Sequence, residues 1–421
     1  MIEDFDGYAG IDWASETHHA CVVDGAGRMV GERDVSHGGS GLAELCDWLV
    51  ATTGASPDRL AVAIETSHGP VVEMLLERGF AVHAINPKQL DRFRDRFTMA
   101  GAKDDSRDAY VLAHALVTDR QAYRRLMLDD PLIIELREWS RLVDDLRDER
   151  TRLANRMREQ LWRYYPQMLE LVDDDIAANW LLELWEEAPT PTKAAQTQVG
   201  AIARILKVHR IQRFDAAEVL RILRQKPLVV APGTVKAASG HIRILIQRIR
   251  LMSQQRKQAH RRLDELCRTL EQQPDGEEEA DNRPEQRDVT ILRSLPGIGR
   301  IILATLLAEA CEALKRRDYH VLRALSGQAP VTRRSGKKCI VLRRYACNRR
   351  LANALYHWSR VAVQHDPVSR ARYAALRQRG HSHGRALRTV GDRLLALACT
   401  LLERQVLFDP HHHDKDRAAA A

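Results

Sequence analysis

The sequence of 421 residues predicts an α/β domain at the N-terminus, a long helical coiled coil and an all-α C-terminal domain. Three observations support this prediction. Short apolar runs alternate with helical stretches over residues 8–125, apolar residues recur at steps of three and four in the middle of the chain, and only helical patterns follow residue 289. A chain of this length exceeds one hydrophobic core, so two or three domains are expected.

The first part of the chain has the element order of a mixed sheet. Strand patterns occupy residues 8–14, 18–24, 28–35, 60–64 and 80–85. Helical patterns occupy about 41–52, 70–78 and the stretch that begins at Pro87. Gly25-Ala26-Gly27 supplies a tight turn between the second and third strands. A meander followed by alternating helices and strands is typical of an RNase H-like fold, and it disfavours a doubly wound sheet of another kind.

Four acidic residues stand where such a fold can build a site. Asp12 lies in the first strand, and Glu65 ends the strand that begins at Leu60, at the edge where open α/β sheets carry their sites. Asp105 and Asp108 open a helix three residues apart, so their carboxylates share a face. Hard Mg²⁺ prefers carboxylate oxygens. The set predicts a two-metal phosphoryl-transfer site, with the ions about 3.5–4 Å apart.

These acids also have ordinary structural interpretations. A lone Asp in a strand is most often an edge or turn residue, and acidic residues in a first helical turn complement the helix dipole. The dipole accounts for Asp105 and Asp108 but not for Asp12 and Glu65. The combination therefore favours a metal site over the separate explanations.

Two apolar seams predict the coiled coil. Residues 132, 136, 139, 143, 146, 150, 153, 157, 160 and 164 form the first, which is apolar or aromatic except at Arg150 and Gln160. Residues 242, 245, 249, 252, 256, 259, 263, 266 and 270 form the second, with Arg256 as its charged member. The seams could pair within one chain or join two chains.

The chain divides at changes of composition. We expect an acidic-site domain over 1–125, the coiled coil with a helical insertion over 131–271, an acidic linker over 272–288, a C-terminal domain over 289–408 and a disordered tail over 409–421. The tail contains His411-His412-His413, which is more simply a tail or tag remnant than a metal site. The helical segment between the seams has no function assigned from sequence.

Basic charge is concentrated in the C-terminal part. Residues 315–393 hold 20 Lys and Arg against 3 Asp and Glu, whereas the whole chain has a net charge of only +8. A focused positive field attracts polyanions, of which nucleic acid is the commonest, although a solvated Arg-rich face is the alternative. No apolar run is long enough for a membrane span. Seven cysteines without a C-x-x-C pair fit a reducing cytoplasm.

The basic region contains two further motifs. Leu295-Pro296-Gly297-Ile298-Gly299 resembles a helix–hairpin–helix element, whose glycines let backbone N–H groups approach a phosphate, although it could be plain turn chemistry. Ser335 is predicted in a loop between Arg333-Arg334 and Lys337-Lys338. Guanidinium groups grip phosphate and stabilise an alkoxide, so the serine is either a nucleophile or a simple hydrogen-bond donor in a phosphate-binding loop.

Together these motifs resemble the IS-110 family of insertion-sequence transposases, over nearly the whole chain. The residues that carry the resemblance are Gly10-Ile11-Asp12, Ala63-Ile64-Glu65-Thr66, Lys103-x-Asp105-x-x-Asp108-Ala109, Leu295–Gly299, and Ala329-Pro330 followed by Ser335-Gly336. Two features depart from the family pattern: Gln328 stands where an apolar residue is common, and the middle helical segment is long.

The resemblance implies a RuvC-like DEDD domain, a coiled coil and a C-terminal transposase domain with a serine nucleophile. Asp12, Glu65, Asp105 and Asp108 would then hold Mg²⁺, Ser335 would attack DNA, and Gly297, Gly299, Arg333, Arg334, Lys337 and Lys338 would contact nucleic acid. It also implies dimers that form tetramers on donor and target DNA, and a structured bridge RNA that pairs with both DNAs. A cytoplasmic, nucleoid-associated protein is expected.

Three functions remain to be compared. The first is a recombinase that forms a covalent phosphoserine intermediate. The second is a RuvC-like junction nuclease that needs the four acids and water but not Ser335. The third is a nucleic-acid scaffold with a decayed site, which the presence of all four acids and the serine makes the weakest.

Overall fold

The computed structural model describes residues 5–85, 87–94, 105–120, 123–127, 130–272, 283–336 and 338–410. The chain divides into two compact units, 1–130 and 131–421, which we describe separately. Lys337, most of the expected acidic linker and the histidine triplet lie outside the described residues.

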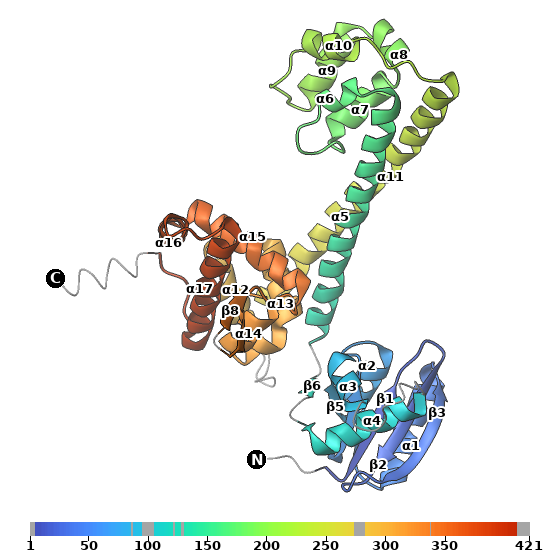
Figure 1. Cartoon of the computed structure of the whole chain (residues 1–421), viewed down its shortest axis with the longest axis vertical. Helices are drawn as coiled ribbons and strands as arrows, with labels where there is room; N and C mark the ends of the chain where they lie inside the picture. The colour runs from blue at the N-terminus through green and yellow to red at the C-terminus, as the bar shows by residue number, and fades with distance from the viewer. Residues whose placement is uncertain are drawn as a thin grey trace, which may run out of the picture. The chain divides into compact units, whose positions relative to one another are not determined.

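A six-stranded sheet with strand order β3-β2-β1-β4-β5-β6 forms the centre of the first unit (Figure 1). Its elements are β1 (Gly7–Asp12), β2 (Thr17–Val23), β3 (Met29–Ser36), α1 (Gly39–Thr53), the 3₁₀ turn η1 (Pro57–Arg59), β4 (Leu60–Ile64), α2 (Pro70–Glu77), β5 (Ala81–Ala84), α3 (Pro87–Arg94), α4 (Asp105–Thr118) and β6 (Arg124–Arg125). The first three strands are antiparallel, and β1, β4 and β5 are parallel. This confirms the mixed sheet, which is consistent with an RNase H-like domain.

The two faces of the sheet are covered by different helices. Helices α1 and α2 pack with Ile11, Val62 and Ile64 on one face, because alternate residues of a strand point the same way. Helix α4 packs on the other face against Ala61 and Ala63. The strands β1 and β4 are therefore buried on both sides, and only their ends are open to a ligand.

Two long helices begin the second unit and pack antiparallel along each other (Figure 1). They are α5 (Pro131–Tyr164) and α11 (Pro232–Gln272). The first part of α5 shares a core with the last part of α11, and the last part of α5 with the first part of α11. Near the middle, Nε of Arg150 donates to Oγ of Ser253 at 3.3 Å. The two predicted seams thus meet within one chain.

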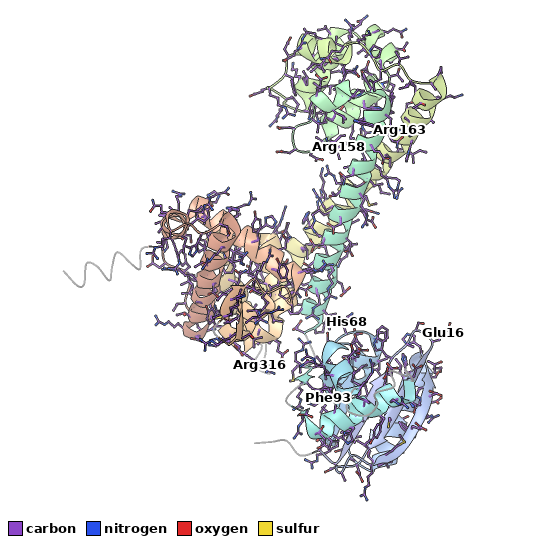
Figure 2. All side chains as sticks on the ribbon, in the orientation of Figure 1. Glu16, His68, Phe93, Arg158, Arg163 and Arg316 are labelled. Carbon is purple, nitrogen blue, oxygen red and sulfur yellow. The ribbon has the colours of Figure 1, made fainter. Side chains whose placement is uncertain are left out.

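Five short helices fill the connection between α5 and α11. They are α6 (Gln167–Glu170), α7 (Asn179–Glu187), α8 (Pro191–Gln196), α9 (Val199–Val208) and α10 (Ala216–Leu223). They share one apolar core with the adjoining parts of α5 and α11, which contains the buried Trp185. Arg158 and Arg163 project from the exposed side of α5 in this region (Figure 2).

The rest of the second unit is helical except for one hairpin. Its elements are α12 (Arg283–Ser294), α13 (Arg300–Lys315), α14 (Tyr319–Leu325), β7 (Val331–Ser335), β8 (Lys338–Leu342), α15 (Arg349–His365), α16 (Pro367–Gln378) and α17 (His383–Arg404). The prediction of an entirely helical C-terminal domain is wrong here, because β7 and β8 pair antiparallel. Val331, Thr332, Ile340 and Val341 are β-branched and favour strands.

None of the helices in the described ranges combines the length and the apolar content that crossing a bilayer requires.

Candidate active site

Asp12 and Glu65 lie at neighbouring strand ends of the first unit. Ile11 of β1 pairs with Ile64 of β4 in parallel register. Asp12 is the last residue of β1 and Glu65 directly follows β4, and both are half-buried. The loops that follow these strands, marked by Glu16 and His68 in Figure 2, leave the same edge of the sheet. The two predicted acids therefore lie at neighbouring strand ends on the same edge of the sheet.

Gly10 determines which helix faces this edge. A Cβ atom at Gly10 would lie 2.0 Å from the carbonyl oxygen of Ala109 and 2.6 Å from the amide nitrogen of Ala113. Only a glycine allows the backbone of α4 to approach β1 this closely. Asp12 is two residues beyond Gly10, so its side chain leaves the strand on the face that α4 covers.

The first turn of α4 carries the other two predicted acids. Asp105 begins the helix and is exposed, whereas Asp108 is only 2% exposed. Oγ of Ser106 donates to Oε2 of Glu32 on β3 at 2.9 Å, which fixes this turn against the sheet. We call the region of Asp12, Glu65, Asp105 and Asp108 the acidic corner.

The buried carboxylate of Asp108 already has a cationic partner. Nε and Nη2 of Arg94, at the end of α3, donate to its two oxygens at 2.6 and 2.7 Å. Nη1 of Arg94 also donates to Asp91 at 2.6 Å. A buried charge is costly unless it is paired, and this bidentate contact supplies the pair. Sequence reasoning missed Arg94, which no spacing rule connects to a residue 14 positions later.

The acidic corner can be tested for its fit to a divalent cation. Within the described ranges, no three His, Cys, Asp or Glu residues converge closely enough to ligate one metal ion. The donor chemistry nevertheless fits, because carboxylate oxygens are the ligands of hard cations. The guanidinium of Arg94 donates to both oxygens of Asp108 and already neutralises this carboxylate. Metal binding there would require Arg94 to release Asp108.

A histidine holds the loop that follows Asp12. The backbone N–H of Ala14 donates to Nδ1 of His18 at 3.3 Å, and Nε2 of His18 lies 3.0 Å from Nδ1 of His37. His18 is fully buried. Burial and the neighbouring His37 lower the pKa of His18, so the neutral ring is the native form. The loop is thereby attached to β2.

Ser335 lies at the end of β7 and not in a loop as predicted. It pairs with Lys338 across the hairpin, and Gly336 adopts a positive φ of 54° in the turn. Residues two apart in a strand, and directly paired residues, share a face. Arg333 and Lys338 therefore flank Ser335 on one face, while Arg334 lies on the other.

Among the residues that the structure describes, the cations of the hairpin have no acidic partners. Arg333, Arg334 and Lys338 are exposed, and within the described part of the chain no carboxylate pairs with them. We call β7 and β8 with these residues the cationic hairpin. Its base is fixed, because Nε of Arg344 donates to the carbonyl of Ala329 at 3.2 Å. The hairpin thus presents a hydroxyl between two cations on a firm support.

The two glycines of the turn before α13 differ in role. Gly297 has a φ of 83°, and a Cβ atom there would lie 2.7 Å from the amide nitrogen of Ala362 on α15. Gly299 precedes α13, is exposed, and has no atom within 4 Å of the corresponding position. Gly297 therefore serves close helix packing, while Gly299 leaves the N-terminus of α13 open.

Comparisons with known proteins match both units. A transposase family model of the DEDD IS110 type matches residues 9–166, and the model described as transposase IS116/IS110/IS902 family matches residues 289–374. A putative transposase, y4uE, of Sinorhizobium fredii is 62% identical over 51% of this chain and 60% of its own length. The mini-circle putative transposase for IS117 of Streptomyces coelicolor is 33% identical over 98% of this chain and 96% of its own length.

A further relative, the 44.8 kDa protein of insertion element IS116 from Streptomyces clavuligerus, is 26% identical over 96% of both chains. The matched DEDD domain implies dependence on a divalent metal in general and DNA as a partner. Because similarity to the IS117 protein extends over almost the whole of both chains, it is not confined to one shared domain. The chain therefore belongs to the IS116/IS110/IS902 family of insertion-sequence transposases.

Proposed function

We propose that this transposase cuts and rejoins DNA strands through a covalent bond between Ser335 and a DNA phosphate. The observation that supports it most is the exposed hydroxyl of Ser335 between Arg333 and Lys338 on one face of the hairpin. A serine hydroxyl needs an environment that favours its deprotonation and stabilises the pentavalent phosphate. The two cations supply such an environment.

The chemistry consists of two transesterifications. In the first, Oγ of Ser335 loses its proton and attacks phosphorus, while the bond to the 3′ oxygen breaks and a 3′-hydroxyl leaves. In the second, a 3′-hydroxyl of another strand attacks the phosphoserine and the serine oxygen leaves with a proton. Each step exchanges one phosphoester bond for another, so joining needs no ATP.

The acidic corner would hold the metal for these steps. Asp12, Glu65, Asp105 and Asp108 are the proposed Mg²⁺ ligands, and bound Mg²⁺ would stabilise the charge that develops on the phosphate. Arg94 pairs with the buried carboxylate of Asp108. Asp12 and Glu65 are held by the parallel pairing of β1 and β4.

Guide RNA and oligomers are further parts of this proposal. The family resemblance supports a structured bridge RNA that pairs with donor and target DNA. Ile244 and Leu251 of α11 are 58% and 49% exposed and lie seven residues apart, so they share a face that a second protomer could cover. Dimers, and tetramers on DNA, are expected in light scattering, and RNA of defined sequence is expected to copurify from cells that carry the whole element.

The covalent intermediate is tested with end-labelled DNA on a denaturing gel. Wild-type protein with Mg²⁺ is expected to give a slowly migrating DNA–protein band that protease removes. Ser335→Ala should lose this band while it retains DNA binding. Thr332→Ala removes another exposed hydroxyl from the same strand and should keep the band. Asp12→Asn should also lose the DNA–protein band, although Ser335 is unchanged in this variant.

The same gel distinguishes the junction nuclease. A water-dependent nuclease would let Ser335→Ala cut DNA as the wild type does and would leave free ends. A covalent band that persists in Ser335→Ala would exclude this serine as the nucleophile. The scaffold alternative predicts that Asp12→Asn and Glu65→Gln change nothing.

A further inference from the structure

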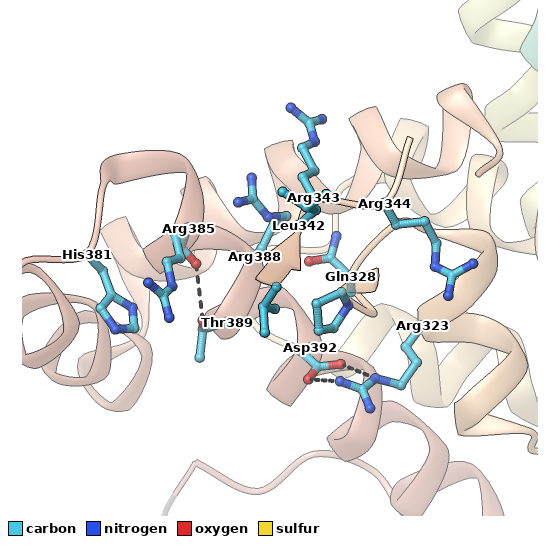
Figure 3. Close-up of a pocket in the computed structure, with 13 residues that line it drawn as sticks. Arg323, Gln328, Leu342, Arg343, Arg344, His381, Arg385, Arg388, Thr389 and Asp392 are labelled. Atoms are coloured by element: carbon cyan, nitrogen blue, oxygen red, sulfur yellow. Dashed lines mark hydrogen bonds and ion pairs between the residues drawn. The ribbon is translucent and has the colours of Figure 1, made fainter. Parts of the chain in front are cut away.

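Two adjoining cavities lie at the base of the cationic hairpin, and Figure 3 shows the larger one. The larger has a volume of about 390 Å³ and the smaller about 130 Å³. Both are lined by Gln328, Arg343, Arg344 and Arg388, so they form one continuous site. Helix α17, the segment after β8 and the segment that contains Gln328 contribute to the wall. We call this site the arginine cavity, and its size is that of a site for one small molecule or nucleotide.

Three of its arginines have no carboxylate partner. Within the described residues, no acidic group pairs with Arg343, Arg385 or Arg388. Arg323, by contrast, donates twice to Asp392, at 3.0 and 2.9 Å, so the carboxylate at this wall is already neutralised (Figure 3). Burial and the like charges of Arg343 and Arg385 lower the pKa of Arg388. Guanidiniums stay protonated in proteins, so the cavity holds uncompensated positive charge.

Buried polar atoms without partners line the same site. Gln328 is 9% exposed and Ser326 only 1%. Oε1 of Gln328 and Oγ of Ser326 are buried, and the structure gives neither a hydrogen bond. Unsatisfied buried polar atoms cost free energy unless a ligand or water completes them. The cavity therefore combines an anion-attracting wall with hydrogen-bonding groups at its floor.

An exposed aromatic ring stands beside the arginines. Tyr345 is 79% exposed, and the guanidinium of Arg343 lies 5.3 Å from the centre of its ring. Aromatic rings next to cationic side chains are the platforms on which unpaired bases stack. Neither a free phosphate nor a paired duplex would use this ring together with the buried polar floor.

We propose that the arginine cavity binds one unstacked nucleotide of a single DNA strand, with its phosphate on Arg343, Arg385 and Arg388 and its base against Gln328. The assignment to DNA rests on the proposed strand-transfer function, because Ser335 ends β7 and the cavity wall includes Leu342 of β8, the partner strand in the same hairpin. Lys338, which pairs with Ser335, is four residues from Leu342 in the cavity wall. At about 3.3 Å per residue this is about 13 Å, close to four base steps of about 3.4 Å.

The test measures equilibrium binding and does not depend on catalysis. Full-length protein is titrated into fluorescein-labelled dT12 and followed by anisotropy at several salt concentrations. The double variant Arg385→Ala/Arg388→Ala is expected to raise Kd at least tenfold and to reduce the salt slope by about 0.7, which corresponds to one phosphate of a single strand. The control Arg393→Ala, an exposed arginine of the same helix outside the cavity, should raise Kd less than threefold.

Three further binding measurements identify the class of ligand that the cavity binds. A duplex of the same length should lose much less affinity than dT12 in the double variant. An abasic dodecamer should bind wild-type protein more weakly than dT12, and Gln328→Leu should reduce this difference. The third measurement uses rU12. If the double variant loses as much affinity for rU12 as for dT12, the result supports a nucleotide site. If it loses affinity for rU12 alone, the assignment to DNA is overturned.

The proposal fails if the double variant binds dT12 as the wild type does, or if Arg393→Ala causes the same loss. Melting temperatures of the variants exclude unfolding as the cause, and Arg→Lys replacements at both positions should restore part of the affinity. Loss of the covalent band in Ser335→Ala is a separate result. A failed cavity therefore leaves the proposed chemistry intact, and failed chemistry leaves the binding result interpretable.

Discussion

The acidic corner and the cationic hairpin differ in how their charged side chains are buried and paired. In the corner, Asp108 of α4 is buried and neutralised by Arg94 of α3, so the charge is balanced inside the fold. On the hairpin, Arg333, Arg334 and Lys338 are exposed, and no carboxylate within the described residues pairs with them. A buried charge costs free energy unless a partner inside the fold neutralises it. An exposed charge is solvated by water and remains available to bind a polyanion. Under the proposed function, metal binding in the corner would exchange one cation for another, whereas DNA binding at the hairpin would neutralise charges that have no partner among the described residues.

The largest effect is expected when Arg94, the partner of the buried Asp108, is removed. Arg94→Ala leaves the buried carboxylate of Asp108 uncompensated, which should reduce the stability of the first unit by about 3–5 kcal/mol. Thermal melting without metal measures this loss. Added Mg²⁺ should raise the melting temperature of Arg94→Ala more than that of the wild type. Arg92→Ala, an exposed arginine of the same helix, should melt as the wild type does. An absent response to Mg²⁺ in Arg94→Ala would contradict a cation site at Asp108.

A second change tests whether close packing positions the corner. In Gly10→Ala the new Cβ atom would overlap the backbone of α4 at Ala109, so the helix must move away from β1. We expect a loss of about 3 kcal/mol and, in the covalent-band assay, a loss of activity. Gly25→Ala adds the same methyl group where nothing lies within 4 Å, and should change neither result. Equal stability of the two variants would show that α4 is not held at Gly10.

A matched glycine pair extends the comparison to the second unit. Gly297→Ala places a methyl group against the backbone of α15 at a positive φ, which should cost about 2 kcal/mol of stability. Gly299→Ala meets no atom in the fold and should leave urea unfolding unchanged. If backbone N–H groups near Gly299 approach a phosphate, that variant alone should weaken duplex binding at normal stability. Weakened binding in neither variant would remove this turn from the nucleic-acid interface.

The smallest expected effect concerns the loop after Asp12. His18 has a lowered pKa in the fold, so the unfolded chain takes up its proton at higher pH than the folded chain. This histidine therefore contributes stability above its ordinary pKa of about 6.5, and the contribution is lost as the pH falls below that value. Urea unfolding of wild type and His18→Gln at pH 7.5 and 5.5 measures the contribution of His18 to the free energy of unfolding. Wild type should lose more stability on acidification than His18→Gln, and an equal loss would contradict the buried neutral ring.

Sequence patterns predicted the parts whose periodicity is set by burial. The strand at Leu60–Ile64 has the predicted bounds, and the edge that carries Asp12 and Glu65 followed from strand order alone. The seams of α5 and α11 were visible because two long helices bury one stripe each. Their pairing within one chain was left open, since a heptad pattern does not identify its partner.

The parts that sequence missed depend on contacts between distant residues. The hairpin β7–β8 is exposed at nearly every position, so it has no alternation of buried and exposed residues. Gly336 and the β-branched residues around it were its only local signal. Arg94 and Gln328 were missed for a related reason, because their partners and surroundings come from other elements. Such residues carry no periodic pattern.

The length of α5 has a mechanical consequence. A helix of 34 residues measures about 51 Å, and its antiparallel partner α11 braces it against bending over that distance. The small helices α6–α10 at one end and the C-terminal helices at the other cannot approach each other without unzipping two apolar seams. Two ligands bound at the opposite ends of the α5–α11 pair would lie about one and a half turns of B-DNA apart, at about 34 Å per turn. The packing of α5 against α11 therefore fixes the separation of these two groups of helices.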